Sequence, residues 1–175
     1  MNIRDVIVAI NRMLAEGVID HYAIGGAVGA TFYLEPVATM DVDIFVTFPA
    51  EKTSSLVSPK PLFDYLKDHG GTMQGEYIVV AGWPVQFLPP TSQLAEEALK
   101  QSVEKPLDGM PARVLTAEHL AAIALQTGRA KDKARLLQFI EAGVLDAERF
   151  EGILAKHALT TRWQQFQRQF LSDNS

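Results

Sequence analysis

The sequence contains no cysteine among its 175 residues. Disulfide bonds, thiolate catalysis, cysteine zinc fingers and iron–sulfur clusters are therefore excluded. Long apolar runs are missing too: the longest uncharged stretches, 22–34 and 77–93, are interrupted by glycine or proline. Both are shorter than the roughly 20 apolar residues of a membrane-spanning helix, so we expect no membrane association.

An excess of basic residues is also missing. The chain has 16 Lys and Arg residues against 21 Asp and Glu residues, a formal net charge of −5. A general nucleic-acid coat needs concentrated positive charge, so this balance argues against one but leaves room for a local basic pocket. The first residues lack the order of charge, apolar run and cleavage site of a secretory signal, and we expect a cytoplasmic protein.

The front part of the chain shows helix and strand patterns in turn. Apolar residues at helical spacing between Ile3 and Leu14 predict a helix that Gly17 ends. The other predicted elements are a strand at 22–24, a helix at 27–34, a strand at 41–48, a loop at 49–61, a helix at 62–69, a hairpin of strands 77–81 and 85–88, a helix from a Thr91 or Ser92 cap to about 101, and a strand at 112–115.

From Thr116 onward the pattern is helical throughout. Breaks fall at Gly128 and Gly143, and Asp146 is a suitable cap for the helix that follows. We therefore expect an α/β (α+β) core over 1–115 and a helical region over 116–175 packed on it. The aromatic residues of the last helix fit core or homodimer contacts, while the arginines beside them leave a nucleic-acid surface as an alternative: Arg162, Trp163, Phe166, Arg168 and Phe170.

Two short segments carry candidate chemistry. Gly25 and Gly26 stand between a predicted strand and a predicted helix, where backbone amides can approach a phosphate. Asp41 and Asp43 are two apart in a predicted strand, so their carboxylates lie on one face. Carboxylates so placed suit Mg²⁺, which binds one or two of them together with substrate phosphates.

Other interpretations of these segments remain. A dinucleotide-binding fingerprint would need glycine at position 24, where the chain has Ile24, and no P-loop sequence is present. A plain glycine turn beside two solvated aspartates is the simplest alternative. Thr39 precedes the acids and can hydrogen-bond a phosphate, orient Asp41, or be an ordinary strand residue.

The string from Ala23 to Val46 resembles the glycine-pair and DxD signature of the DNA-polymerase-β-like nucleotidyltransferase superfamily. The segments 115–120 and 128–136 resemble, in their order and spacing, a sequence segment of small stand-alone members of the AbiEii type. The resemblance implies a mixed sheet flanked by helices with a C-terminal helical bundle. It also implies transfer of a nucleoside monophosphate from a nucleoside triphosphate to a hydroxyl acceptor of unknown kind: protein, RNA or small molecule.

The resemblance also assigns roles to residues. Gly25 and Gly26 would hold the triphosphate, and Asp41 and Asp43 would bind Mg²⁺ or Mn²⁺. Lys131 would contact phosphates, with Asp132 orienting it or a metal-bound water. The residues agree in part, because Lys131 and Arg135 are four apart and share a helix face. A solvated basic face is the alternative.

One position departs from the family pattern. A third carboxylate comes from a later strand in the family, and the matching string here, 82–88, has Gln86 at that place. A neutral amide is at most a weak ligand and cannot act as a base. With a turn at Gly82 and Trp83, Glu76 would point to the opposite face and would not replace the missing group. Two functions compete: an active nucleotidyltransferase, or a catalytically weak nucleotide-binding or regulatory module of the toxin–antitoxin type.

Overall fold

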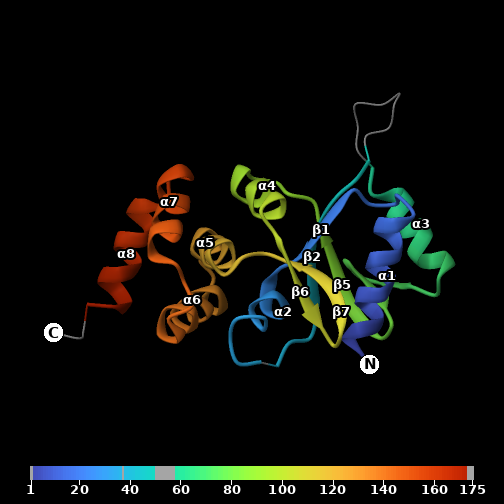
Figure 1. Cartoon of the computed structure of the whole chain (residues 1–175), viewed down its shortest axis with the longest axis horizontal. Coiled ribbons are helices and arrows are strands. Elements are labelled where there is room, and N and C mark those ends of the chain that lie inside the picture. The colour runs from blue at the N-terminus through green and yellow to red at the C-terminus, as the bar shows by residue number, and fades with distance from the viewer. Residues whose placement is uncertain (1, 37, 50–57, 173–175) are drawn as a thin grey trace.

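The computed structural model describes residues 2–36, 38–49 and 58–172, and it contains a seven-stranded mixed sheet with helices on both faces (Figure 1). The strands are β1 (His21–Ile24), β2 (Val42–Thr47), β3 (Thr72–Gln74), β4 (Tyr77–Val80), β5 (Trp83–Leu88), β6 (Val103–Leu107) and β7 (Met110–Val114). Their order in the sheet is β3-β4-β5-β2-β1-β7-β6. The β2–β5 and β1–β7 pairs are parallel, and the other pairs are antiparallel.

The helices divide between the two faces. The helices are α1 (Ile3–Ala15), α2 (Gly26–Ala30), α3 (Lys60–Asp68), α4 (Gln93–Lys100), α5 (Ala117–Thr127), α6 (Ala130–Ala142), α7 (Ala147–Lys156) and α8 (Thr160–Phe170). Figure 1 shows α1 and α3 on one side of the sheet, with α2, α4 and the C-terminal helices on the other. No helix of the described chain has the length and apolarity needed to cross a membrane.

Alternation along β2 separates two apolar cores. Val42, Ile44 and Val46 are fully buried against residues of α1 and α3, whereas Phe45 faces the other way. Phe45 packs against the second core, formed mainly by α4 to α8. Asp43, lying between Val42 and Ile44, therefore points to the same face as Phe45, toward the helical region. The predicted side-by-side placement of the two aspartates follows from this alternation.

Glycine and capping signals set the ends of the C-terminal helices. Gly128 and Gly143 adopt left-handed conformations after α5 and α6, with φ of 68° and 64°, and the Asp146 side chain accepts from the Arg149 amide at the start of α7. Glycine is the residue that adopts this conformation with little strain, which is why the chain turns at these points. The predicted helix breaks and the predicted cap are confirmed.

The prediction and the structure differ in three elements, and a fourth falls mostly outside the described residues. The helix expected over 27–34 ends at Ala30 and continues as turns, and most of the loop expected over 49–61 falls outside the described residues. The strands β3 and β6 were not predicted. Both lie at the edges of the sheet, and their apolar pattern is weak because β3 is exposed throughout and β6 is exposed at alternate residues.

The hairpin of β4 and β5 turns one residue earlier than expected. Ala81 and Gly82 form its two-residue loop with φ of 51° and 82°, and Val80 pairs with Trp83. Two consecutive residues with positive φ make the loop whose twist matches the flanking strands. Alanine is unusual at the first position, so no local pattern indicated a turn at Ala81. Because of this shift, the β4–β5 register places Tyr77 opposite Gln86 where Val79 was expected.

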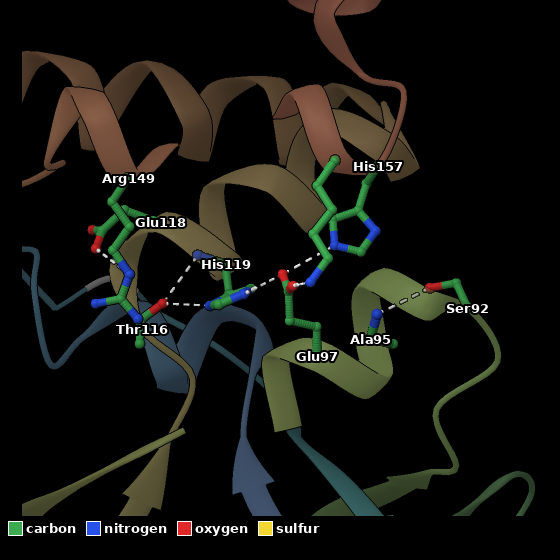
Figure 2. Close-up of polar contacts among 9 residues, drawn as sticks. Ser92, Ala95, Glu97, Thr116, Glu118, His119, Arg149 and His157 are labelled. Atoms are coloured by element: carbon green, nitrogen blue, oxygen red, sulfur yellow. Dashed lines mark hydrogen bonds and ion pairs between the residues drawn. The ribbon is translucent and has the colours of Figure 1, made fainter. Parts of the chain in front are cut away.

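A buried polar network joins the sheet-side helix α4 to the C-terminal helices (Figure 2). Glu97 of α4 accepts hydrogen bonds from His119 of α5 and His157 of α7, each at 3.0 Å, and it also pairs with Lys156. The Thr116 hydroxyl accepts from the His119 backbone amide and lies 2.7 Å from Nδ1 of the His119 ring. Because the Glu97 carboxylate can only accept, the ring proton of His119 lies on Nε2, and Nδ1 accepts from the Thr116 hydroxyl. His119 is thus a buried structural residue.

Candidate nucleotidyl-transfer site

The glycine pair and the acid pair meet at one end of β1 and β2. Gly25 follows β1, and its amide donates to the Asp43 carbonyl at 2.9 Å. Gly26 opens α2 with φ of 56°, and a Cβ atom placed there would lie 2.2 Å from an Asp43 carboxylate oxygen. Only glycine fits a backbone that is both left-handed and this close to a side chain. The first turn of α2 therefore lies directly against the Asp43 carboxylate.

Backbone amides are available beside this contact. The amides of Gly26, Ala27 and Val28 stand in the first turn of α2, where no intrahelical carbonyl can accept from them. The Gly25 amide, in contrast, is already bonded to β2. Gly25 also packs against the Phe45 ring, which a Cβ at that position would meet at 2.6 Å. Gly25 thus fixes the turn, and the amides that follow it face the site.

Neighbouring side chains orient and perturb the acid pair. The Thr39 hydroxyl lies 3.1 Å from the Asp41 carbonyl and 3.4 Å from its carboxylate, and the Tyr77 hydroxyl lies 3.3 Å from the other Asp41 carboxylate oxygen. Burial and the nearby charge of Asp41 raise the pKa of Asp43, while Lys131, Arg135 and Arg129 act in the opposite direction. A charged pair at this spacing favours a cation between its members.

Three basic residues face the acids across a cleft of about 450 Å³. Arg129 immediately precedes α6, and Lys131 and Arg135 lie on its first two turns. Besides these five charged residues, the cleft wall includes Ala27, Ala38, Thr39, Met40, Ala134 and Gln138. The predicted common face of Lys131 and Arg135 is confirmed, and it faces the predicted acid pair.

Asp132 has a different place from the one expected. Its side chain is buried and accepts from the Arg129 side chain at 2.7 Å and from the Arg129 backbone amide at 3.3 Å, with Arg135 3.7 Å away. Asp132 therefore holds the two arginines that flank the cleft instead of contacting Lys131. Sequence reasoning passed over Arg129, and the acid three residues later at a helix start is the one local signal for this contact, because such an acid can accept from the preceding backbone amide.

Gln86 stands next to the acid pair. In the parallel β2–β5 ladder it pairs with Asp43, and the observed β4–β5 register places Tyr77 beside it on the far side. The Gln86 side-chain nitrogen lies 3.5 Å from a carboxylate oxygen of Glu76. The prediction that Glu76 points away from Gln86 is wrong, because it treated Glu76 as a strand residue, whereas Glu76 lies in the turn that precedes β4.

The donor set fits a divalent cation shared with a ligand. Asp41 and Asp43 supply hard carboxylate oxygens of the kind that Mg²⁺ prefers. No set of three or more His, Asp or Glu side chains within the described ranges is arranged to hold a metal ion. A cation at this pair would therefore take its remaining oxygen ligands from water or from a bound phosphate.

Comparisons with known proteins give structural similarity but no sequence match. No family model and no curated protein sequence matches the chain. Solved structures that resemble it include ANT(2")-Ia in complex with adenylyl-2"-tobramycin, with 16% identity and a TM-score of 0.55 over 90% of this chain and 97% of the other. The solution structure of ANT(2'')-Ia gives a TM-score of 0.52 at 16% identity, covering 94% and 96% of the two chains.

A third similar structure is that of a nucleotidyltransferase-like protein. The antigenic nucleotidyltransferase-like protein of Paracoccidioides brasiliensis has 14% identity and a TM-score of 0.57, covering 93% of this chain and 90% of that chain. At these identities the similarity concerns the arrangement of helices and strands. The chain therefore has the fold of these nucleotidyltransferase structures, built from a mixed sheet and a C-terminal group of helices.

Proposed function

We propose that the protein is a Mg²⁺-dependent nucleotidyltransferase that moves a nucleoside monophosphate from a nucleoside triphosphate to a hydroxyl group. The observation that carries this proposal is the cleft in which Asp41 and Asp43 face Arg129, Lys131 and Arg135. An acid pair suits a cation, and three basic groups suit the negative charge of a polyphosphate. Few ligands other than a metal-bound nucleotide need both at once.

Each side of the cleft has a distinct role. Asp41 and Asp43 would hold Mg²⁺ or Mn²⁺, which when bound polarises the phosphoryl group and neutralises the charge that develops on pyrophosphate. The first-turn amides of α2, positioned by Gly25 and Gly26, would donate to phosphate oxygens, as helix N-termini do. Lys131 and Arg135 would bind the same phosphates from the opposite wall, with Asp132 keeping Arg135 and Arg129 in place.

The reaction itself is an in-line substitution. The acceptor oxygen attacks the α-phosphorus and forms a new phosphoester bond, while the bond to the bridging oxygen breaks and pyrophosphate leaves. Thr39 and Tyr77 keep the Asp41 carboxylate oriented through the step. A cytoplasmic location, where nucleoside triphosphates are present, goes with this function.

The hydroxyl compound that receives the nucleotide is to be identified by experiment. One similar structure, ANT(2")-Ia, contains adenylylated tobramycin, so an aminoglycoside is one acceptor to test on this chain. A protein hydroxyl and an RNA end are the others. Transfer of label from α-³²P nucleoside triphosphates to each class identifies the acceptor directly.

A second function is favoured by Gln86. Because an amide stands beside Asp43 where a further acid would strengthen metal binding, the chain could bind nucleotides with little catalysis, as a regulatory module of the AbiEii or toxin–antitoxin type. Labelling of an acceptor by the natural protein supports the enzyme. Activity that appears only in the Gln86→Asp variant supports the regulatory module.

A thermal-shift screen of four nucleoside triphosphates, with and without Mg²⁺, tests the shared core of both functions. A ligand present at 100 times its Kd stabilises the native state by about 2.7 kcal/mol. We expect a shift that requires Mg²⁺ and a nucleotide together. Absence of any such shift at millimolar concentrations contradicts nucleotide binding and both proposed functions.

A further inference from the structure

Three adjacent strands bring three polar side chains together at the end of the sheet that holds the acid pair. Asp43 of β2 pairs with Gln86 of β5, and the β4–β5 register continues the row to Tyr77. Side chains opposite one another in neighbouring strands lie on the same face of a sheet. Asp43, Gln86 and Tyr77 therefore share one face of the sheet, and Asp43 lines the cleft.

Tyr77 ties this row to Asp41. Its hydroxyl lies 3.3 Å from an Asp41 carboxylate oxygen. The charge of Asp41 and desolvation raise the pKa of Tyr77, with smaller contributions from the charges of Glu76 and Asp43. Glu76 directly precedes Tyr77, and its 3.5 Å contact with Gln86 brings it to the strand neighbour of Asp43.

Glu76 differs from the other acids of the site in its partners. Its carboxylate lies 3.5 Å from the neutral Gln86 amide, and it forms no ion pair with any residue in the described ranges. Asp132, by contrast, is paired with Arg129, and Asp41 and Asp43 face the three basic residues. A carboxylate held by a neutral amide keeps oxygen lone pairs free to accept a proton, whereas a guanidinium would favour its charged form.

We propose that Glu76 is the general base that accepts the proton of the attacking hydroxyl, and that Gln86 positions it. This inference rests on the proposed function and names a residue for it. As the acceptor oxygen bonds to the α-phosphorus, its proton passes to the Glu76 carboxylate and the bond to pyrophosphate breaks. The neutral Glu76 then returns its proton to solvent, since the side chain is exposed. Gln86 thus occupies the position beside Asp43 as the residue that orients a carboxylate supplied by the turn before β4.

Two substitutions at Glu76 test the inference. The assay is pyrophosphate release from the four nucleoside triphosphates with Mg²⁺, using molar glycerol as the hydroxyl acceptor. General-base catalysis typically contributes 10²- to 10⁴-fold, so we expect losses of that size in Glu76→Ala and Glu76→Gln. Added formate should restore activity at least tenfold in Glu76→Ala, where space is left for it, and should have no effect on Glu76→Gln.

Binding measurements separate this role from a structural one. Both variants should keep the Mg²⁺-dependent thermal shift of the natural protein, and Glu148→Gln, an exposed acid on α7, should match the natural protein in every assay. Activity within threefold of natural in Glu76→Ala overturns the inference. A loss that formate does not restore, with or without weaker nucleotide binding, assigns Glu76 a structural role and overturns it too.

The natural protein also distinguishes this inference from the proposed function. If it binds Mg²⁺ and a nucleotide but releases no pyrophosphate, Glu76 supplies no base and the inference fails while nucleotide binding stands. If it shows no binding at all, the proposed function fails and the inference falls with it. Transfer by the natural protein together with formate rescue of Glu76→Ala supports both.

Discussion

Asp43 is the residue at which burial, repulsion and attraction oppose one another. Burial and Asp41 raise its pKa, and three basic groups across the cleft act against them. Carboxylates that are stable only with a cation destabilise the unliganded protein, a cost that functional sites commonly carry. Gly26 is subject to a second constraint, because its backbone touches the same carboxylate.

Asp43→Asn should abolish the Mg²⁺-dependent part of the nucleotide thermal shift, a loss of up to about 2.7 kcal/mol at saturating ligand. The same change removes a repulsive charge, so the unliganded variant should unfold at a higher temperature than the natural protein. Asp68→Asn, an exposed acid at the end of α3, is the control and should change neither value. An unaltered Mg²⁺ response in Asp43→Asn contradicts the metal assignment.

Gly26→Ala and Gly17→Ala form a matched pair of substitutions. Both glycines have positive φ, 56° and 73°, but a Cβ at Gly17 meets nothing within 4 Å. Strain alone should cost Gly17→Ala about 1–2 kcal/mol of unfolding free energy. Gly26→Ala should lose more and should also lose nucleotide binding, because the new methyl group displaces the Asp43 carboxylate; urea unfolding and thermal shift measure the two effects. Equal behaviour of the two variants would show that the close contact has no role in binding.

Helix α6 shows how one element delivers charge to the cleft. Asp132 accepts from both the backbone amide and the side chain of Arg129, and Arg135 lies near the same acid on the next turn. A helix start therefore serves two purposes here, satisfying backbone donors and fixing two guanidinium groups that face the acid pair.

Asp132→Ala and Asp146→Ala separate these two purposes. Each removes a cap-region acid, from α6 and α7 respectively, and each should lower the unfolding free energy by about 1 kcal/mol. Only Asp132→Ala releases arginines that line the cleft, so only it should weaken Mg²⁺–nucleotide binding in a titration. If Asp146→Ala weakens binding as much, the effect comes from general destabilisation and the positioning role of Asp132 is refuted.

The Glu97 network acts at the scale of the whole molecule, because it joins α4 to α5 and α7 (Figure 2). Burial alone would raise the pKa of Glu97, but hydrogen bonds from Lys156, His119 and His157 lower it to about 2. Burial lowers the pKa of His119 despite its bond to Glu97. Both groups bind protons more readily in the unfolded chain than in the native state.

The protein should therefore lose stability as the pH falls. For His119 the loss begins below its usual pKa near 6.5, and for Glu97 it extends from about 4.5 down to about 2, because the unfolded state takes up more protons in both windows. The Glu97 contribution is on the order of 3 kcal/mol, since one pKa unit corresponds to about 1.4 kcal/mol.

Glu97→Gln should lower the urea midpoint at pH 7 and flatten its decline between pH 5 and pH 3. Glu96→Gln changes the exposed neighbour on the same helix and should leave the curve as in the natural protein. Identical pH dependence in the natural protein and Glu97→Gln would mean that the network does not couple α4 to the C-terminal helices.

The sequence by itself determined the elements whose signals are local. Glycines at 128 and 143, the Asp146 cap and the alternation through Val42 to Val46 depend on neighbours within a few residues, and so helix ends and the face of Asp43 could be predicted. The common face of Lys131 and Arg135 followed for the same reason. The placement of the acid pair opposite these two residues depends on packing between distant segments. It was indicated by the resemblance to the nucleotidyltransferase superfamily and not by any local sequence pattern.

Only the tertiary structure decided the contacts that cross strands. The positive φ of Ala81 moved the hairpin register by two residues and brought Glu76 to Gln86, and no local preference of alanine indicates such a turn. Arg129 and Asp132 likewise acquired their roles from the cleft that α6 closes against β2. The register of paired strands and the docking of helices are set by the burial of whole faces, to which many residues contribute. No single segment of the chain therefore determines them.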